Sequence, residues 1–403
     1  MSGYLDDLSI VQEEKLKKFR DRVKDVCTDK HNDYQLLRWL RARDFDLDKS
    51  EKMFRNDVKW RKDNKCDTIL DTWKPPEVIQ KYYTGGLAGF DKEGCPVWID
   101  PYGHIDIRGL TRSVKSSDVK RYGIYLAETI FSYFASQTEK LGKTIDQVTL
   151  IFDLDKLGTK HMYRPGLDLL IEVFVMFEDH YPETLKFAYV INAPRLFPVA
   201  FRLIKPFLSE HTRNRIHILG GNFKKELLNL MSPEELPVHW GGDRKDKNGD
   251  PKCSTDISFG GDVPEECYLS ASTVSISDDW LELDVGRGST QKLEYEVKKE
   301  GCLLKWEFMT DGSDIGFGVF MKTAPGPQKS DEMEVVVPSN RLNSHIVPED
   351  GNLECTKTGT YVIRFDNSYS YVKAKKVKYN IQVLEADTMS DVSFHSAQDV
   401  TLM

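Results

Sequence analysis

The most constraining feature of this chain is an apolar segment between residues 196 and 208, in which Arg202 and Lys205 are the only charged side chains. A helix over this range would place four large apolar residues on one face, at spacings of four, three and four: Phe197, Phe201, Ile204 and Leu208. Two more would line another face: Leu203 and Phe207. A helix that is apolar on two faces is either a buried core helix or a cover over apolar matter that is not protein. Both interpretations stay open on these residues alone.

The chain around this segment alternates between short apolar runs and helical patterns, from about residue 76 to residue 245. Four apolar runs predict strands: residues 96–100, 148–153, 187–191 and 215–219. Three helices are predicted between or after them: residues 115–140, 165–179 and 195–208. Near-continuous apolar strands separated by helices are typical of an α/β sheet that helices cover. We therefore predict an α/β domain over residues 76–245.

Residues 1–75 are rich in charge and carry helical patterns. One helix is predicted at Leu36-Leu37-Arg38-Trp39-Leu40-Arg41-Ala42-Arg43, and a second from about Leu47 to Lys62. In the second helix Met53 and Trp60 lie seven residues apart, so one apolar face is continuous. The region is predicted to form a small helical bundle.

The pattern changes again after the α/β region. A polar stretch rich in turn dipeptides, together with the segment after it, predicts a linker over residues 246–274. Beyond it apolar residues alternate with polar ones at a period of two, for example across residues 304–308. Six or more such strands predict an antiparallel β-sandwich over residues 275–384, followed by a flexible tail at residues 385–403. The predicted fold class is multidomain, α/β plus all-β.

Composition limits the partners and the compartment that we expect. A net charge of -8 and a pI near 5.7 argue against nucleic acid as a partner, because phosphate binding needs a concentrated basic face. The first residues are acidic, and no run reaches the roughly 18 apolar residues that span a bilayer. Seven cysteines without Cys-x-x-Cys spacing, and the lack of an Asn-x-Ser/Thr acceptor, are typical of a reducing compartment. We expect a cytoplasmic protein with transient peripheral association with membranes.

The sequence contains no familiar catalytic motif. Gly142-Lys143-Thr144 lacks the upstream glycine of a phosphate loop, because position 137 is Gln, and His-Glu-x-x-His, Gly-x-Ser-x-Gly and Gly-x-Gly-x-x-Gly do not occur. Asp153 and Asp155 lie at the end of a predicted strand, where a carboxylate can act as an acid, but a turn or a helix cap explains them more simply. We expect no enzymatic activity, no metal and no cofactor.

Four motifs between residues 181 and 220 resemble the lipid-exchange gate of the Sec14-like (CRAL-TRIO) family. They are Tyr181-Pro182-Glu183, Ile191-Asn192-Ala193-Pro194, Lys205-Pro206-Phe207-Leu208 and Ile218-Leu219-Gly220. Residues 1–75 resemble the family's N-terminal helical region, and residues 76–245 its lipid-binding domain. Residues 275–384 resemble a GOLD domain, and two runs carry this likeness: residues 311–319 and 361–370. The three-part order is similar to that of supernatant protein factor and related SEC14-like proteins.

This resemblance implies a carrier that holds a hydrophobic lipid in an apolar cavity and exchanges it at membranes through a mobile gate helix. The implied cargo is an isoprenoid such as squalene, a tocopherol-like molecule, or a retinoid such as retinaldehyde. We expect these residues to line the cavity: Ile151, Phe174, Phe177, Tyr189 and Ile191. We expect these to form the gate: Phe197, Phe201, Leu203, Ile204 and Phe207. An aldehyde would need one or two hydrogen-bond donors, and the candidates are Tyr189, Tyr163 and Ser132.

The resemblance also implies a phosphoinositide headgroup site at Arg43, Glu183 and Arg215. Asp44 departs from the family pattern, because it places a negative charge where a second cation is expected. A structural ion pair between Glu183 and Arg215 is the other interpretation. The competing function is a phosphoinositide-sensing regulatory or scaffold protein in membrane trafficking, with a protein partner on its GOLD domain. Either a solvated strand edge or a contact with anionic lipid or a protein partner is predicted for four lysines: Lys373, Lys375, Lys376 and Lys378.

Overall fold

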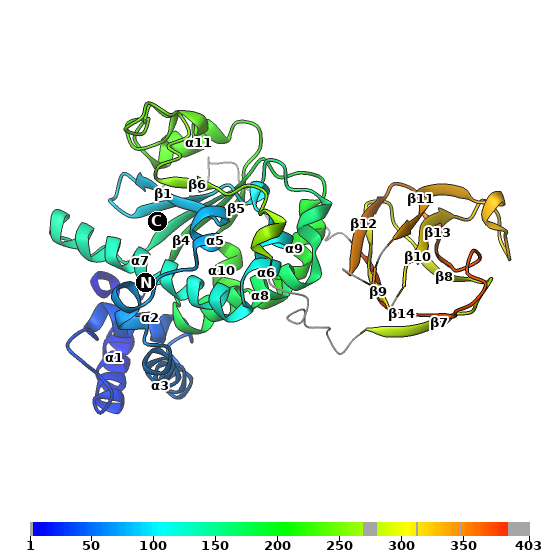
Figure 1. Cartoon of the computed structure of the whole chain (residues 1–403). Helices are drawn as coiled ribbons and strands as arrows, with labels where there is room; N and C mark the ends of the chain where they lie inside the picture. Colours follow the sequence, from blue (N-terminus) through cyan, green and yellow to red (C-terminus); the bar gives the residue numbers. More distant parts are fainter. Residues whose placement is uncertain (1–2, 269–279, 312, 343, 346–347, 386–403) are drawn as a thin grey trace.

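The computed structural model of the protein describes residues 3–268, 280–311, 313–342, 344–345 and 348–385. A bundle of helices forms the N-terminal part of the molecule (Figure 1). Its members are η1 (Leu5–Asp7), α1 (Ile10–Val23), α2 (Asp33–Arg41), α3 (Leu47–Asn64), η2 (Cys66–Thr68) and α4 (Ile69–Thr72). Side-chain caps begin the three longest of these helices: Ser9, Asn32 and Asp46. Their apolar faces meet in a core that includes Phe19, Leu37, Leu40 and Phe54. The predicted helical bundle is confirmed.

A six-stranded sheet forms the centre of the next domain, in the order β5-β4-β3-β2-β1-β6. Its strands are β1 (Thr84–Phe90), β2 (Pro96–Asp100), β3 (Val148–Asp153), β4 (Leu185–Ile191), β5 (Ile216–Ile218) and β6 (Ile257–Phe259). Strands β2 to β5 run parallel, whereas β1 is antiparallel to both β2 and β6. The predicted α/β class is confirmed. Strand β1 was not predicted, because Gly85, Gly86 and Gly89 interrupt its apolar pattern.

Helices cover both faces of this sheet (Figure 1). On one face α11 (Phe223–Leu230) packs its buried Leu227 in a cluster with Ile99 and Trp240. The layer on the other side contains α5 (Glu77–Tyr82), α6 (Ile107–Ser113), α7 (Ser116–Leu141), α8 (Arg164–His180), α9 (Phe197–Ile204) and α10 (Glu210–Asn214). Short 3-10 turns join these elements: η3 (Tyr102–His104), η4 (Thr159–Met162), η5 (Lys205–Phe207), η6 (Val238–Trp240) and η7 (Glu265–Cys267). The face opposite α11 therefore lies beneath a layer of helices.

The linker predicted over residues 246–274 is wrong for residues 246–268, which pack against the sheet. Strand β6 pairs with β1, and the fully buried Ile257 lies opposite Gly86. A Cβ at Gly86 would lie 2.0 Å from a backbone carbonyl oxygen next to β6, so this approach requires glycine. The prediction failed because a strand of three residues is too short to show alternation. Residues 269–274 lie outside the described residues.

Two four-stranded antiparallel sheets, in the orders β11-β10-β13-β8 and β12-β9-β14-β7, form the C-terminal domain. Their strands are β7 (Leu281–Val285), β8 (Thr290–Val297), β9 (Cys302–Thr310), β10 (Ile315–Met321), β11 (Glu334–Leu342), β12 (Glu349–Cys355), β13 (Gly359–Asp366) and β14 (Lys375–Leu384). Phe308, Phe317 and Phe365 meet in the core between the sheets. The predicted β-sandwich is confirmed, although the largely polar β11 and β12 escaped the prediction. Of the tail predicted at residues 385–403, the structure describes Glu385.

The lysine run of the sandwich does not lie on a strand edge. Strand β14, which carries most of it, lies between β9 and β7. Lys375 is buried, and its Nζ lies 3.2 Å from Asp314 Oδ1. Lys376 and Lys378 both pair with Glu282 of β7, at 3.3 and 3.5 Å. The interpretation as a solvated edge is therefore wrong, because β7 covers that side of β14.

Candidate functional site

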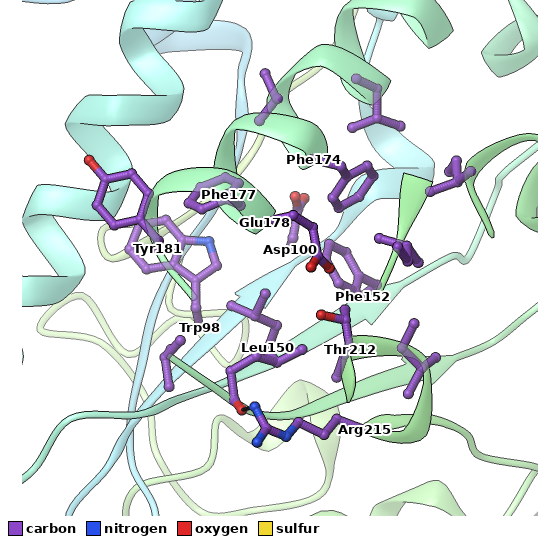
Figure 2. Close-up of a pocket in the computed structure, with 18 of the residues that line it drawn as sticks. Trp98, Asp100, Leu150, Phe152, Phe174, Phe177, Glu178, Tyr181, Thr212 and Arg215 are labelled. Atoms are coloured by element: carbon purple, nitrogen blue, oxygen red, sulfur yellow. Dashed lines mark hydrogen bonds between the residues drawn. The ribbon is translucent and has the colours of Figure 1, made fainter. Parts of the chain in front are cut away.

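An apolar cavity of about 330 Å³ lies between the sheet and the helix layer, with contributions from α7, α8, α9 and α10. Figure 2 shows aromatic and aliphatic side chains from β2, β3 and α8 converging on it: Trp98, Leu150, Phe152, Phe174 and Phe177. Small-molecule sites typically enclose about 300 to 1,000 Å³, and an apolar lining of this kind favours an apolar ligand. The cavity is therefore the candidate site for a hydrophobic molecule.

The structure places six of the residues predicted for the cavity and gate at the cavity wall: Ile151, Phe174, Phe177, Phe197, Phe201 and Ile204. The prediction is wrong for Tyr189 and Ile191, which pack in the cluster beneath α11 on the opposite face of the sheet. Alternate residues of a strand point to opposite faces, and in β4 it is Ala188 and Val190 that line the cavity. Ile151 touches the cavity but also belongs to the cluster on the opposite face.

Helix α9 lines the cavity and lies on the side of the α/β domain that faces the β-sandwich (Figure 1). The face of α9 that carries Phe197, Phe201 and Ile204 covers the cavity. Leu203, on another face, packs in a cluster with Leu303 of β9 and Leu384 of β14. Arg202 Nη1 lies 3.2 Å from Glu385 Oε2, beside these apolar contacts. Leu203 is therefore a contact of the sandwich and not part of the cavity wall. The structure also places the predicted gate residue Phe207 elsewhere, in the turn η5, where it is 44% exposed.

A cluster of charged residues forms one end of the cavity, at the start of β4. Glu183 Oε2 accepts a hydrogen bond from Arg215 Nη2 at 2.8 Å and lies 3.5 Å from Arg41 Nε. On its other side, Glu183 Oε1 lies 3.6 Å from His211 Nδ1 of α10. The Glu183 side chain is only 5% exposed, so Arg41 and Arg215 compensate a buried carboxylate that also has the His211 ring beside it. The ion pair between Glu183 and Arg215 expected from the sequence is present.

The other predicted headgroup residues lie at the rim of this cluster. Arg43 lines the cavity, but its guanidinium donates to the Ala42 carbonyl oxygen at 2.7 Å. The Asp44 side chain is 89% exposed, and its Oδ1 lies 3.6 Å from His211 Nε2. Arg41 was not among the residues predicted for this site. Its position on the buried face of α2, among the leucines of that helix, is the signal that could have identified it.

An acid of a different kind lies at the C-terminal end of β2. Asp100 lines the cavity, and its Oδ1 accepts a hydrogen bond from Thr84 Oγ1 at 2.6 Å. Burial raises the pKa of Asp100 from 3.8 to about 6, opposed by the Thr84 hydrogen bond. Burial, and next the Asp100 charge, also raise the pKa of Tyr102, which lines the cavity nearby. Asp100 was not predicted as a site residue, although it ends an apolar run two residues after Trp98, on the same face of the strand.

Several other candidates lie away from the cavity. Ser132 donates to the Thr129 carbonyl oxygen, and Tyr163 packs in a separate cluster with Ile105, so the three donors considered for an aldehyde are all absent from the cavity wall. Asp153 accepts hydrogen bonds from Trp240 Nε1 and from an asparagine after β4, each at 2.8 Å. Its contacts are thus structural. In the described part of the chain we find no group of residues suited to a metal ion, and no helix long and apolar enough to cross a membrane.

Known proteins resemble this chain along most of its length. The CRAL/TRIO domain model matches residues 80–242, and the CRAL/TRIO N-terminal domain model matches residues 10–56. Protein ctg-1 of Caenorhabditis elegans is 31% identical over 378 residues, which cover 93% of this chain and 96% of the relative. A CRAL-TRIO domain-containing protein of the same organism is 33% identical over 304 residues, which cover 72% of this chain and 41% of that protein. The similarity to the crystal structure of Sfh5 covers 63% of this chain and 93% of the Sfh5 chain, with a TM-score of 0.50. At 19% sequence identity, this similarity supports the fold alone.

Proposed function

Because this chain belongs to the CRAL/TRIO, or Sec14-like, family of lipid-binding and lipid-transfer proteins, we propose that it carries a hydrophobic lipid between membranes. The proposed cargo is an isoprenoid, a tocopherol-like molecule or a retinoid. The observation that carries the proposal is the apolar cavity beneath α9, lined by side chains such as Phe152, Phe174 and Phe201. No catalytic step is part of this function. We place it in the cytoplasm, with transient contact with membrane surfaces.

The energetics of such a cargo favour exchange at a membrane. Each buried CH₂ group contributes about 0.8 kcal/mol, so a lipid of about twenty carbons gains on the order of 16 kcal/mol on leaving water. Release into water is therefore too slow to serve transfer. Unloading needs a second apolar phase, and a cover that opens against a membrane provides it.

We propose α9 as that cover. Pro198 lies in its first turn and Pro206 lies in the following turn η5, so both ends lack a backbone donor and the helix can move as a short unit. For α9 to move away from the cavity, its contact with the β-sandwich must also break, because the outer face of α9 packs against the sandwich. Leu303 is the centre of that contact. It is fully buried, and alternation along β9 points it away from the sandwich core toward α9.

Transfer of labelled lipid between vesicles tests this function, together with native mass spectrometry of the purified chain. We expect lipid in the native protein and transfer by the wild type. Phe201→Ala should lower loading and slow transfer several-fold, because it removes an aromatic side chain that covers the cargo. Leu303→Ala should instead accelerate transfer, because it weakens the contact that holds α9 closed. Leu281→Ala is the matched control, since Leu281 lies in the same sandwich and is 60% exposed.

Two results would contradict the carrier function: a native protein without lipid, or a wild type that moves no lipid between vesicles. A phosphoinositide-sensing scaffold is then the better function. The cluster of Arg41, His211 and Arg215 around Glu183 favours this second candidate, as does the sandwich, which resembles a GOLD domain in sequence. Its test is binding to phosphoinositide vesicles, with Arg215→Ala as the variant expected to lose it.

A further inference from the structure

Asp100 is one of the acids at the cavity wall, and the carrier function does not yet explain it. It ends β2, and the parallel register places it beside Phe152 of β3. Figure 2 shows its carboxyl group in the cavity region, where the labelled neighbours include Phe152 and Phe174. A carboxyl group in such surroundings is costly unless it has partners.

The partners that the protein provides are few. Among the described residues, only the Thr84 hydroxyl donates a hydrogen bond to the Asp100 carboxyl group, and no cationic side chain forms an ion pair with it. An ionised carboxylate has about four acceptor sites. The Asp100 carboxylate, which lines the cavity, can therefore accept further hydrogen bonds from a ligand. Its raised pKa, near 6, agrees with this incomplete compensation.

The position of Asp100 also suits an amphiphile that lies along the strands. The register aligns Asp100 with Phe152 and, one strand further, with Val190. Leu185, at the charged end of the cavity, lies five residues earlier on the same strand, which corresponds to roughly 16 Å. A ligand with its polar group at Asp100 thus has the length of the sheet available for its apolar body.

We propose that Asp100, positioned by Thr84, binds the hydroxyl group of the cargo, and that the cargo is a lipid alcohol. The proposal rests on the carrier function above and narrows its ligand class. A hydroxyl can donate to a carboxylate and can also accept from a neutral carboxylic acid, so it pairs with Asp100 in both protonation states. An aldehyde has only an acceptor and is repelled by the carboxylate. A hydrocarbon such as squalene leaves the acid without a partner.

A set of three ligands with one skeleton separates these cases: all-trans-retinol, all-trans-retinal and retinyl methyl ether. Each quenches tryptophan fluorescence on binding, and Trp98 lines the cavity. With lipid-free full-length protein at pH 7.5, we expect retinol to bind about tenfold or more tightly than the ether, the effect of one hydrogen bond to a charged group. Asp100→Leu should reduce that preference to within about twofold. Asp100→Asn, which keeps an amide donor and acceptor, should retain part of it and guards against misfolding of the first variant.

Asp155→Asn is the matched control, because Asp155 is an acid of the same domain whose side chain is 61% exposed and does not line the cavity. Retention of the retinol preference in this variant, with its loss in Asp100→Leu, supports the proposal. Equal binding of retinol and the ether by the wild type would overturn it and leave the carrier function intact. The same holds for an Asp100→Leu variant that keeps the preference. If the wild type binds none of the three ligands and carries no lipid, the carrier function fails, and this proposal with it.

Discussion

Two of the acids that line the cavity are Glu183, just before β4, and Asp100, at the end of β2, and the protein treats them differently. Glu183 has Arg215 at 2.8 Å, Arg41 at 3.5 Å and His211 at 3.6 Å. Asp100 has one neutral partner, the hydroxyl of Thr84 at 2.6 Å. The comparison shows that the Glu183 carboxylate already has its counter-charges within the protein, in Arg41 and Arg215. A carboxyl group with spare hydrogen-bond capacity at an apolar wall is instead suited to a ligand.

Backbone geometry adds to the contrast. Glu183 has a φ of +61°, in the left-handed region that costs a non-glycine residue of order 1 kcal/mol or more. Its ion pairs, and the bonds that its neighbours form in β4, hold it there. Asp100 lies in a regular strand and carries no such strain. Three substitutions test the difference between the surroundings of Glu183 and those of Asp100.

The largest effect is expected at the Glu183 end. Glu183→Ala leaves Arg41 and Arg215 without their buried counter-charge, and loss of one partner from a buried pair costs about 3 to 5 kcal/mol in the free energy of unfolding. Urea titration of lipid-free protein at pH 7 measures it. The control is Glu178→Ala, which removes an acid that forms no ion pair with the described residues and should cost about 1 kcal/mol or less. A loss below 1 kcal/mol for Glu183→Ala would mean that the cluster is not structural.

An intermediate effect, dependent on pH, is expected at Asp100. Its pKa rises from 3.8 in the unfolded chain to about 6 in the folded protein, chiefly through burial. The folded state then binds the proton more tightly, so the free energy of unfolding falls as pH rises from about 4 to about 6. Above pH 7 the full penalty, at most about 3 kcal/mol, is present. The Asp100→Asn variant lacks this penalty. Its free energy of unfolding, relative to that of the wild type, should therefore increase as pH rises from about 4 to about 6.

Urea titrations of lipid-free wild type and Asp100→Asn at pH 4, 5, 6 and 7 measure that difference. Thr84→Val is a useful companion, because loss of the hydroxyl should raise the pKa of Asp100 further and move the window upward. A stability difference between Asp100→Asn and the wild type that is independent of pH would show that Asp100 is better compensated than the structure indicates.

The smallest effect is expected at Asp44, on the rim of the charged end. Its side chain is 89% exposed, so Asp44→Asn should change the free energy of unfolding by no more than about 0.5 kcal/mol. Removal of a negative charge beside His211 should raise affinity for phosphoinositide vesicles, by no more than several-fold at physiological salt. Vesicle flotation across a salt series tests this. An unchanged affinity would indicate that the anionic headgroup, if bound, lies elsewhere.

Regular patterns made much of the fold predictable. Strands β2 and β3 begin and end where the apolar runs at residues 96–100 and 148–153 do. The helix predicted at residues 165–179 corresponds to α8. The elements that escaped have weak local signals: β1 is interrupted by glycines, β6 has three residues, and β11 is mostly exposed. Their pairing partners, rather than their own residues, make them strands.

The site was less predictable than the fold. Periodicity identified Phe197, Phe201 and Ile204, because a helix fixes which residues share a face. It could not say which face of a doubly covered strand meets the cavity, so Tyr189 and Ile191 were chosen where Ala188 and Val190 lie. Both faces of β4 are apolar, and composition does not separate them.

By itself the sequence determined the order of the three regions, the α/β and all-β classes, and the amphipathic faces of the gate segment, because these depend on the local period of apolar residues. Only the tertiary structure decided that Leu203 meets Leu303 of the sandwich, that Arg41 joins Glu183, and that Asp100 faces the cavity with a lone hydroxyl partner. Contacts between residues far apart in the chain depend on how the elements pack, and the charge state and partners of a buried acid depend on those contacts.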